Sequence, residues 1–123
     1  METADFVTVL FEGPSNPAKV TVGFVMAVNA LARGHSSTLV LMVEGVKLGL
    51  PGATDGLAAG HPFAPVSELL AKFLAQGGRV ALCASCLEHF GYGPADVVPG
   101  YEIITAGEVV DLLTAARGSL QVT

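Results

Sequence analysis

The stretch RVALCASCLEHFG, residues 79–91, contains both cysteines of the chain and joins a strand pattern to a helix pattern. Arg79 to Leu82 is an apolar run that predicts a strand, and residues 85–90 predict a short helix. Cys83 and Cys86 lie where the strand ends and the helix begins. The free N–H groups and the partial positive charge of a helix start both stabilise a thiolate. The stretch therefore predicts a strand-to-helix unit that carries a reactive sulfur centre.

The same alternation of strand and helix patterns extends outward in both directions. Apolar stripes at spacings of three and four predict helices at residues 17–33, 65–76 and 107–117, and short apolar runs predict strands at 6–11, 37–43, 101–105 and 119–122. Residues 44–62 are rich in Gly and Pro and predict a long loop, with a short helical turn at 46–50. Strands that alternate with helices pair in parallel through right-handed crossovers. We expect a three-layer α/β domain with a mostly parallel sheet of about five strands.

In such a sheet, ligands and reactive groups gather beyond the carboxyl ends of the strands. Three segments are predicted to reach this edge, at residues 12–16, 44–47 and 83–86. The cysteine pair is thus predicted where chemistry is expected.

Length and composition favour a single domain over residues 1–123, because a chain of this length can bury roughly two-thirds of its unfolded surface. The chain is 51% hydrophobic and 14% charged, which is apolar for a globular domain, and we expect part of the excess to lie in subunit contacts. The net charge of −5, with only six Lys and Arg, argues against a nucleic-acid partner.

The longest apolar stretch, Val20 to Leu31, is shorter than the roughly 20 residues that a membrane span requires. The acidic segment of residues 1–5 lacks the basic region of a secretory signal. We therefore expect a soluble, cytoplasmic protein without a membrane partner. Thiols stay reduced in the cytoplasm, so the cysteine pair indicates redox, sulfur or metal chemistry rather than a structural disulfide.

Motifs along nearly the whole chain resemble those of the DsrE/DsrF-like family of small intracellular sulfur-relay proteins. They are the Gly13-Pro14 loop before a helix, the helix end at residues 30–35, Glu44-Gly45-Val46, Gly77-Gly78 before the cysteine strand, Cys83 with Gly91 eight residues later, and the segment from Pro99 to Ile103 before a closing apolar helix. The resemblance implies a flavodoxin-like fold, assembly into homotrimers or hexamers, and a cysteine that carries sulfur as a persulfide. By its spacing to the glycine, that cysteine is Cys83.

A persulfide carrier needs a thiolate, and the free amides of residues 84–86 would favour one at Cys83. Cys86 could attack a Cys83 persulfide and release the sulfur, or close a protective disulfide. A thiol-disulfide oxidoreductase would cycle the same pair. Both cysteines could also be inert, since free Cys often packs as a small hydrophobic residue.

Other candidate residues surround the pair. Glu44 and Lys47 could form a helical ion pair, or Lys47 could support the thiolate. Ser85 lies between the cysteines, His61 could fold over them from the Gly-rich loop, and the Gly13 loop could cradle an anion or cap a helix. The pair offers two of the four ligands that zinc requires, so we predict no metal and no cofactor.

Two functions remain open. The first is a sulfur carrier or sulfurtransferase-like protein that holds a persulfide on Cys83 and exchanges sulfur with donor and acceptor proteins. The second is a non-catalytic oligomeric module for small-ligand binding or regulation, in which the cysteines are incidental.

Overall fold

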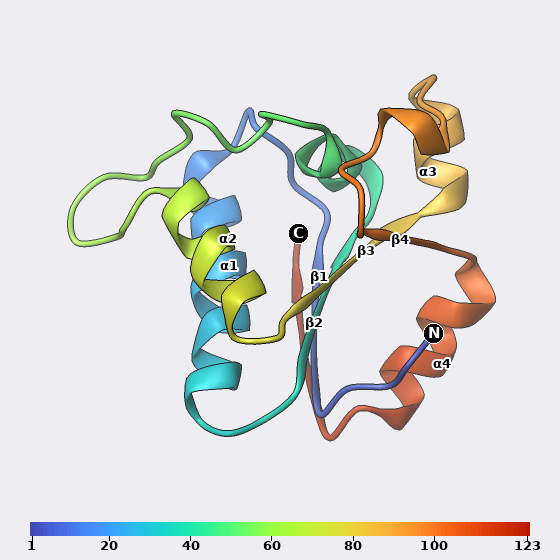
Figure 1. The fold of residues 1–123 in the computed structure, drawn as a ribbon, viewed down its shortest axis with the longest axis horizontal. Helices are drawn as coiled ribbons and strands as arrows, with labels where there is room; N and C mark the ends of the chain where they lie inside the picture. The colour runs from blue at the N-terminus through green and yellow to red at the C-terminus, as the bar shows by residue number, and fades with distance from the viewer.

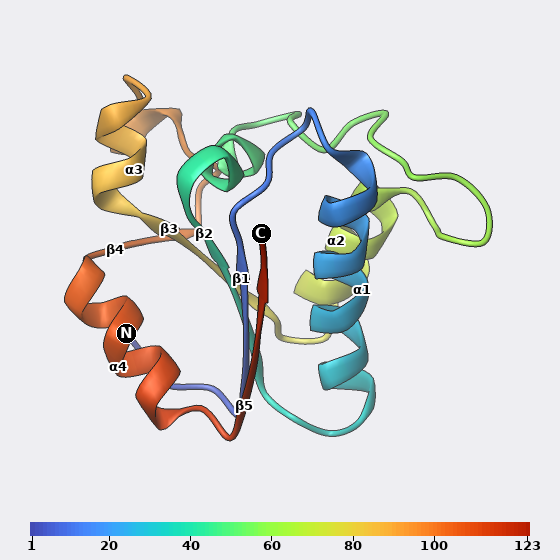
Figure 2. The same ribbon diagram turned by 180° about the vertical axis from the view of Figure 1, so that it is seen from behind.

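A five-stranded sheet lies between two layers of helices in the computed structural model, which describes residues 1–123 (Figures 1 and 2). The elements are β1 (Phe6–Leu10), α1 (Pro17–Ala32), β2 (Ser37–Leu41), the 3-10 helix η1 (Val43–Gly49), α2 (Val66–Ala75), β3 (Arg79–Cys83), α3 (Ala84–His89), the 3-10 turn η2 (Pro94–Asp96), β4 (Glu102–Ile104), α4 (Ala106–Ala115) and β5 (Gly118–Val122). The strand order is β4-β3-β2-β1-β5, and every neighbouring pair is parallel. The predicted three-layer α/β fold is confirmed, and the sheet is parallel throughout.

The inner strands are buried on both faces, as their continuous apolar sequences require. All five residues of β2 are buried, and so are the last four of β1. Helices α1 and α2 cover one face and α4 covers the other, while α3 lies beyond the carboxyl end of β3 (Figures 1 and 2). The two faces form separate cores, of 16 and 8 buried residues.

Helix α1 shows how the local sequence sets these boundaries. The side chain of Asn16 accepts a hydrogen bond from the Lys19 amide at 3.3 Å, and Pro17 occupies the first turn, where its missing N–H costs nothing. Gly34 ends the helix with a φ of 87°, a conformation that favours glycine. No helix of the structure combines the length and the apolar character that crossing a membrane demands.

The segment after β2 differs from the prediction. The strand was expected to reach Val43, but it ends at Leu41. The helical turn expected at 46–50 is part of a 3-10 helix that begins earlier, at Val43, and ends at Gly49. Met42 still donates its backbone N–H to the Leu10 carbonyl at 3.1 Å. The chain then turns sharply, because Val43 has a φ of 53°.

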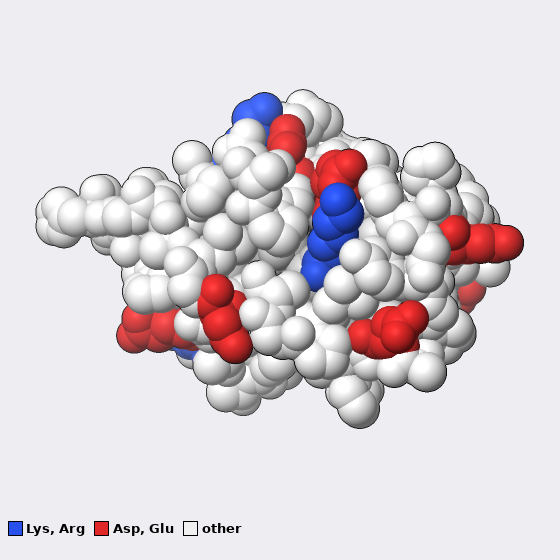
Figure 3. Space-filling model, turned by 90° about the horizontal axis from the view of Figure 1, so that it is seen from above, with Lys and Arg blue, Asp and Glu red and all other residues white.

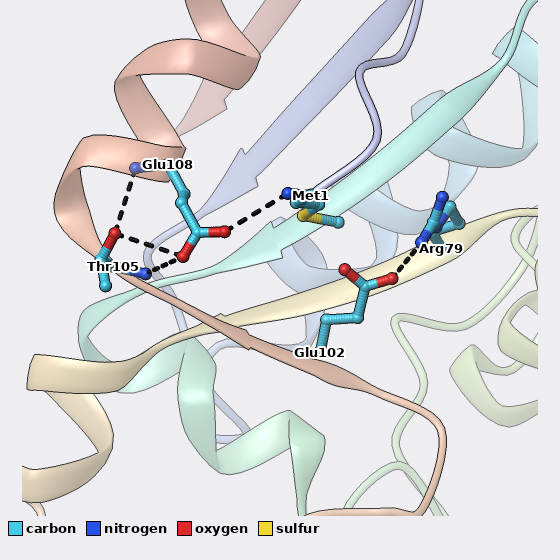
Figure 4. Close-up of polar contacts among 5 residues, drawn as sticks. All are labelled: Met1, Arg79, Glu102, Thr105 and Glu108. Carbon is cyan, nitrogen blue, oxygen red and sulfur yellow. Dashed lines mark hydrogen bonds and ion pairs between the residues drawn. The ribbon is translucent and has the colours of Figure 1, made fainter.

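Helix α4 and strand β4 are held by the polar contacts in Figure 4. Thr105 and Glu108 form a capping box, and the amino group of Met1 lies 3.4 Å from Oε2 of Glu108. Hydrogen bonds, first of all from the Thr105 backbone N–H, hold the pKa of the Glu108 carboxyl below its ordinary value. Glu102 of β4 forms an ion pair with Arg79 of β3. These contacts fix β4 and the start of α4 beside the strand that ends at Cys83.

Candidate functional site

Two chain segments approach each other very closely at the carboxyl edge of the sheet. A Cβ atom on Gly13 would lie 2.7 Å from the Glu44 carbonyl oxygen, and one on Gly45 would collide with the Leu10 carbonyl oxygen. Only glycine permits these backbone contacts. Gly13 therefore positions η1 against the loop after β1, in direct contact with Glu44.

Cys83 is the last residue of β3 and the N-cap residue of α3. Its side chain is buried, with 3% of the residue exposed. Its sulfur accepts no capping hydrogen bond from the amides of the first helical turn, although the sequence suggested that these amides would stabilise a thiolate. Cys83 is therefore an enclosed thiol, with Ile104 as its neighbour on β4.

Cys86 lies one helical turn further and is half-buried. It lines a pocket of about 250 Å³ together with four other residues, Val43, Ser85, His89 and Phe90. The structure thus gives solvent a route to Cys86, whereas Cys83 is not part of the pocket lining.

Cys83 and Cys86 are neighbours across the start of α3. Burial is the main cause that raises the pKa of the Cys86 thiol, and the neighbouring Cys83 raises it further. The backbone N–H of Val43 donates a hydrogen bond to the Cys86 sulfur and opposes this rise.

Val43 has an unusual backbone conformation for a β-branched residue. A positive φ of 53° costs such a residue on the order of 1–3 kcal/mol. The residue is also 44% exposed, so burial of its side chain does not offset this cost. The strained residue lies in the wall of the pocket that contains Cys86.

Lys47 and Glu44 form the ion pair that the sequence suggested, with 2.6 Å between Nζ and Oε2. The hydrogen bond to Glu44 raises the pKa of the Lys47 ammonium. The same ammonium lies 4.9 Å from the centre of the Phe90 ring. Lys47 therefore contacts a wall of the pocket, and its charge is directed at Glu44 and Phe90.

His61 is not brought to the cysteines. It is exposed and belongs to the loop between η1 and α2, which extends past α1 and α2 on the side of the molecule opposite α3 (Figures 1 and 2). The histidine of the pocket is His89 instead, one turn after Cys86 and in edge contact with Phe90 at 5.0 Å between ring centres. The structure contains no group of three or more His, Cys, Asp or Glu side chains suited to hold a metal ion.

Charged groups are sparse at the carboxyl edge. Figure 3 views this edge from above and shows a largely uncharged surface, on which basic groups lie beside acidic ones. Two ion pairs account for this arrangement, Lys47 with Glu44 and Lys19 with Glu12 at 3.4 Å. Further acidic groups lie toward the rim of this view, most of them without a basic neighbour, so the edge as a whole is acidic (Figure 3).

The protein is thus a parallel α/β domain with a cysteine pair at the carboxyl end of an inner strand. The chain belongs to the DsrE/DsrF-like family, whose model matches residues 5–121. The resemblance noted in the sequence is thereby confirmed.

Two similar proteins come from Methanopyrus kandleri and Methanocaldococcus jannaschii. The MK0008 protein of Methanopyrus kandleri is 27% identical over 111 residues, which cover 89% of this chain and 88% of that protein. The MJ0760 protein of Methanocaldococcus jannaschii is 29% identical over 103 residues, 83% of this chain. The match covers only 37% of the length of MJ0760.

Solved structures share the fold. The Escherichia coli ychN protein superposes with a TM-score of 0.75 at 23% identity and covers 98% of this chain and 99% of its own. The BT1422 protein of Bacteroides thetaiotaomicron gives a TM-score of 0.65 at 20% identity, with 95% and 94% covered. At these identities the likeness shows the fold alone.

Proposed function

We propose that this protein is a cytoplasmic sulfur carrier, sulfurtransferase-like in its chemistry, that holds sulfane sulfur as a persulfide on Cys83. The observation that carries the proposal is the pair of free thiols at the carboxyl end of β3, one enclosed and one beside a pocket. Membership of the DsrE/DsrF-like family supports it. The proposal includes a homotrimer or hexamer that exchanges sulfur with donor and acceptor proteins.

The surroundings suit a persulfide, which is easily lost to other thiols. Cys83 is 3% exposed, so a persulfide on it would be shielded from small thiols in solution. Glu44, Lys47 and Gly13 would act indirectly, because they fix η1 and thereby the Val43 amide near Cys86. Ser85 lines the entrance, and His61 is left out of the proposed site.

The burial of Cys83 equally favours the second function, a non-catalytic oligomeric module with inert cysteines. Exposure to inorganic polysulfide, followed by alkylation and intact-mass measurement, separates the two. A carrier gains the mass of one sulfur atom, and fragment ions formed between Cys83 and Cys86 assign the stored sulfur to Cys83.

The double variant with Cys83→Ser and Cys86→Ser provides the blank for this experiment. A wild-type protein that takes up no more sulfur than the double variant, while circular dichroism shows both to be folded, would exclude the carrier function.

A further inference from the structure

The two cysteines differ in a way that the storage of sulfur on Cys83 does not explain by itself. A donor cannot easily reach Cys83, because only 3% of this residue is exposed. Cys86 is half-buried and forms part of the pocket wall. Attack on a sulfur donor requires access as well as a thiolate. The thiol that first reacts with a donor therefore need not be the thiol that stores the sulfur.

The pocket is built around Cys86 from two elements that are distant in the sequence. Val43 contributes its side chain from η1, and Ser85, His89 and Phe90 come from α3 and its end. Val43 lines this pocket with a strained backbone conformation, at a φ of 53°. Strain of this kind persists only where the surrounding structure enforces it, and it is concentrated at functional sites.

We propose that Cys86 is the entry thiol, which receives sulfane sulfur in the pocket and passes it inward to Cys83. This inference rests on the proposed function and adds an order of events to it. The substrate class is a terminal S–SH group, as found at the end of a persulfide or a polysulfide. A pocket of about 250 Å³ admits such a slender group.

The transfer consists of two balanced exchanges. In the first, the Cys86 thiolate attacks the outer sulfur of a donor R–S–SH. A new S–S bond forms on Cys86, the donor S–S bond breaks, and the donor leaves as the thiolate R–S⁻ with the bonding electron pair. The Val43 N–H can stabilise the Cys86 sulfur while it carries negative charge.

In the second exchange, Cys83 attacks the outer sulfur of the Cys86 persulfide. The Cys86 S–S bond breaks, an S–S bond forms on Cys83, and the proton of Cys83 passes to Cys86, which becomes a thiol again. The sulfane sulfur keeps its oxidation state throughout, so no oxidant or reductant is required. Cys83 at the N-cap of α3 and Cys86 in the first turn place the two thiols at the same helix start, as this step needs.

The test compares Cys86→Ser with Cys83→Ser, a matched pair, during exposure to inorganic polysulfide at neutral pH. Samples are quenched by alkylation and measured as intact mass over time. We expect Cys86→Ser to load at least about tenfold more slowly than the wild type, because only the buried thiol remains. Cys83→Ser should still gain one sulfur atom, which fragment ions should place on Cys86, because this variant lacks the thiol to which Cys86 would pass it.

Wild-type kinetics give a second readout that depends on no variant. Fragment ions should show sulfur first on Cys86 and later on Cys83. Equal loading of Cys86→Ser and wild type, or sulfur that reaches Cys83 first, would overturn the entry role while leaving the carrier function intact. Failure of the wild type to take up any sulfur would instead remove the proposed function itself.

Discussion

The two edges of the sheet contain pockets of similar size, and only one of these two pockets is lined by a cysteine. The pocket at the amino edge is the larger, at about 300 Å³, and is lined by Phe6, Met26, Asn29, Ala30, Arg33 and His35. The pocket at the carboxyl edge, at about 250 Å³, contains a thiol. Pocket volume alone would therefore favour the amino edge, whose pocket contains no cysteine.

The two edges differ more in the packing of their backbone than in the volume of their pockets. At the amino edge, a Cβ atom on Gly34 would meet nothing within 4 Å. At the carboxyl edge, Gly13 and Gly45 are pressed against the backbone of neighbouring segments, and Val43 is strained. Close approach of one backbone segment to another is thus found at the edge where the thiols lie, whereas the tightly packed glycine of the amino edge, Gly78, meets only the Phe73 side chain.

Substitution of the glycines should give the largest difference between the edges. Gly45→Ala drives a Cβ atom into the Leu10 carbonyl, and we expect a loss of about 3 kcal/mol in the free energy of unfolding. Gly34→Ala, the matched control, places a Cβ atom in open space at a φ of 87° and should cost about 1 kcal/mol. Urea denaturation measures both, and equal losses would contradict the contrast in packing.

A substitution in the wall of the carboxyl-edge pocket should have an effect of intermediate size. Phe90→Ala removes part of the apolar surface that buries Cys86, so the raised pKa of this thiol should fall toward its ordinary value. Alkylation at neutral pH should then accelerate by roughly three- to tenfold, because more thiolate is present. Measurements in the Cys83→Ser background report on Cys86 alone.

Met26→Ala at the amino edge is the control for Phe90→Ala. It trims an exposed wall of the other pocket and should leave the alkylation rate unchanged. An equal acceleration in both variants would indicate a general loosening of the fold rather than a local effect on Cys86.

Glu108, at the start of α4, should show the smallest effect. Its pKa in the folded protein is below the ordinary 4.5, so the carboxylate stabilises the fold above that value, and the contribution disappears as the pH falls through the lowered pKa. Glu108→Gln should therefore flatten the decline in stability on acidification. Thermal melts across the acidic range test this, and parallel declines in variant and wild type would refute it.

Much of the fold could be predicted because its signals are local. Asn16 with Pro17, and Gly34, mark the ends of α1 in the sequence as they do in the structure. The end of β2 could not be predicted, because the φ of Val43 is set by contacts between η1 and the loop after β1, far apart in the sequence.

In the candidate site, too, features set by local sequence could be predicted and features set by distant contacts could not. The placement of the cysteine pair at the carboxyl edge follows from strand and helix order. Phe90 lies four residues after Cys86, so helical spacing could have indicated it as a neighbour of the thiol. Val43 carries no such signal, because its amide reaches Cys86 through a conformation that valine rarely adopts.

The pairing of β1 with β5 has a consequence for how the chain folds. Phe6 pairs with Gly118 and Leu10 with Val122, so one side of β1 is completed only by a segment from the opposite end of the domain. Contacts of such long sequence separation close late and slow the folding of a domain. During synthesis, a chain that ends at Arg117 would leave the hydrogen-bonding groups on one side of an apolar strand without a partner. The nascent protein should therefore be most prone to aggregation just before β5 emerges, when this temporary edge can pair with another chain.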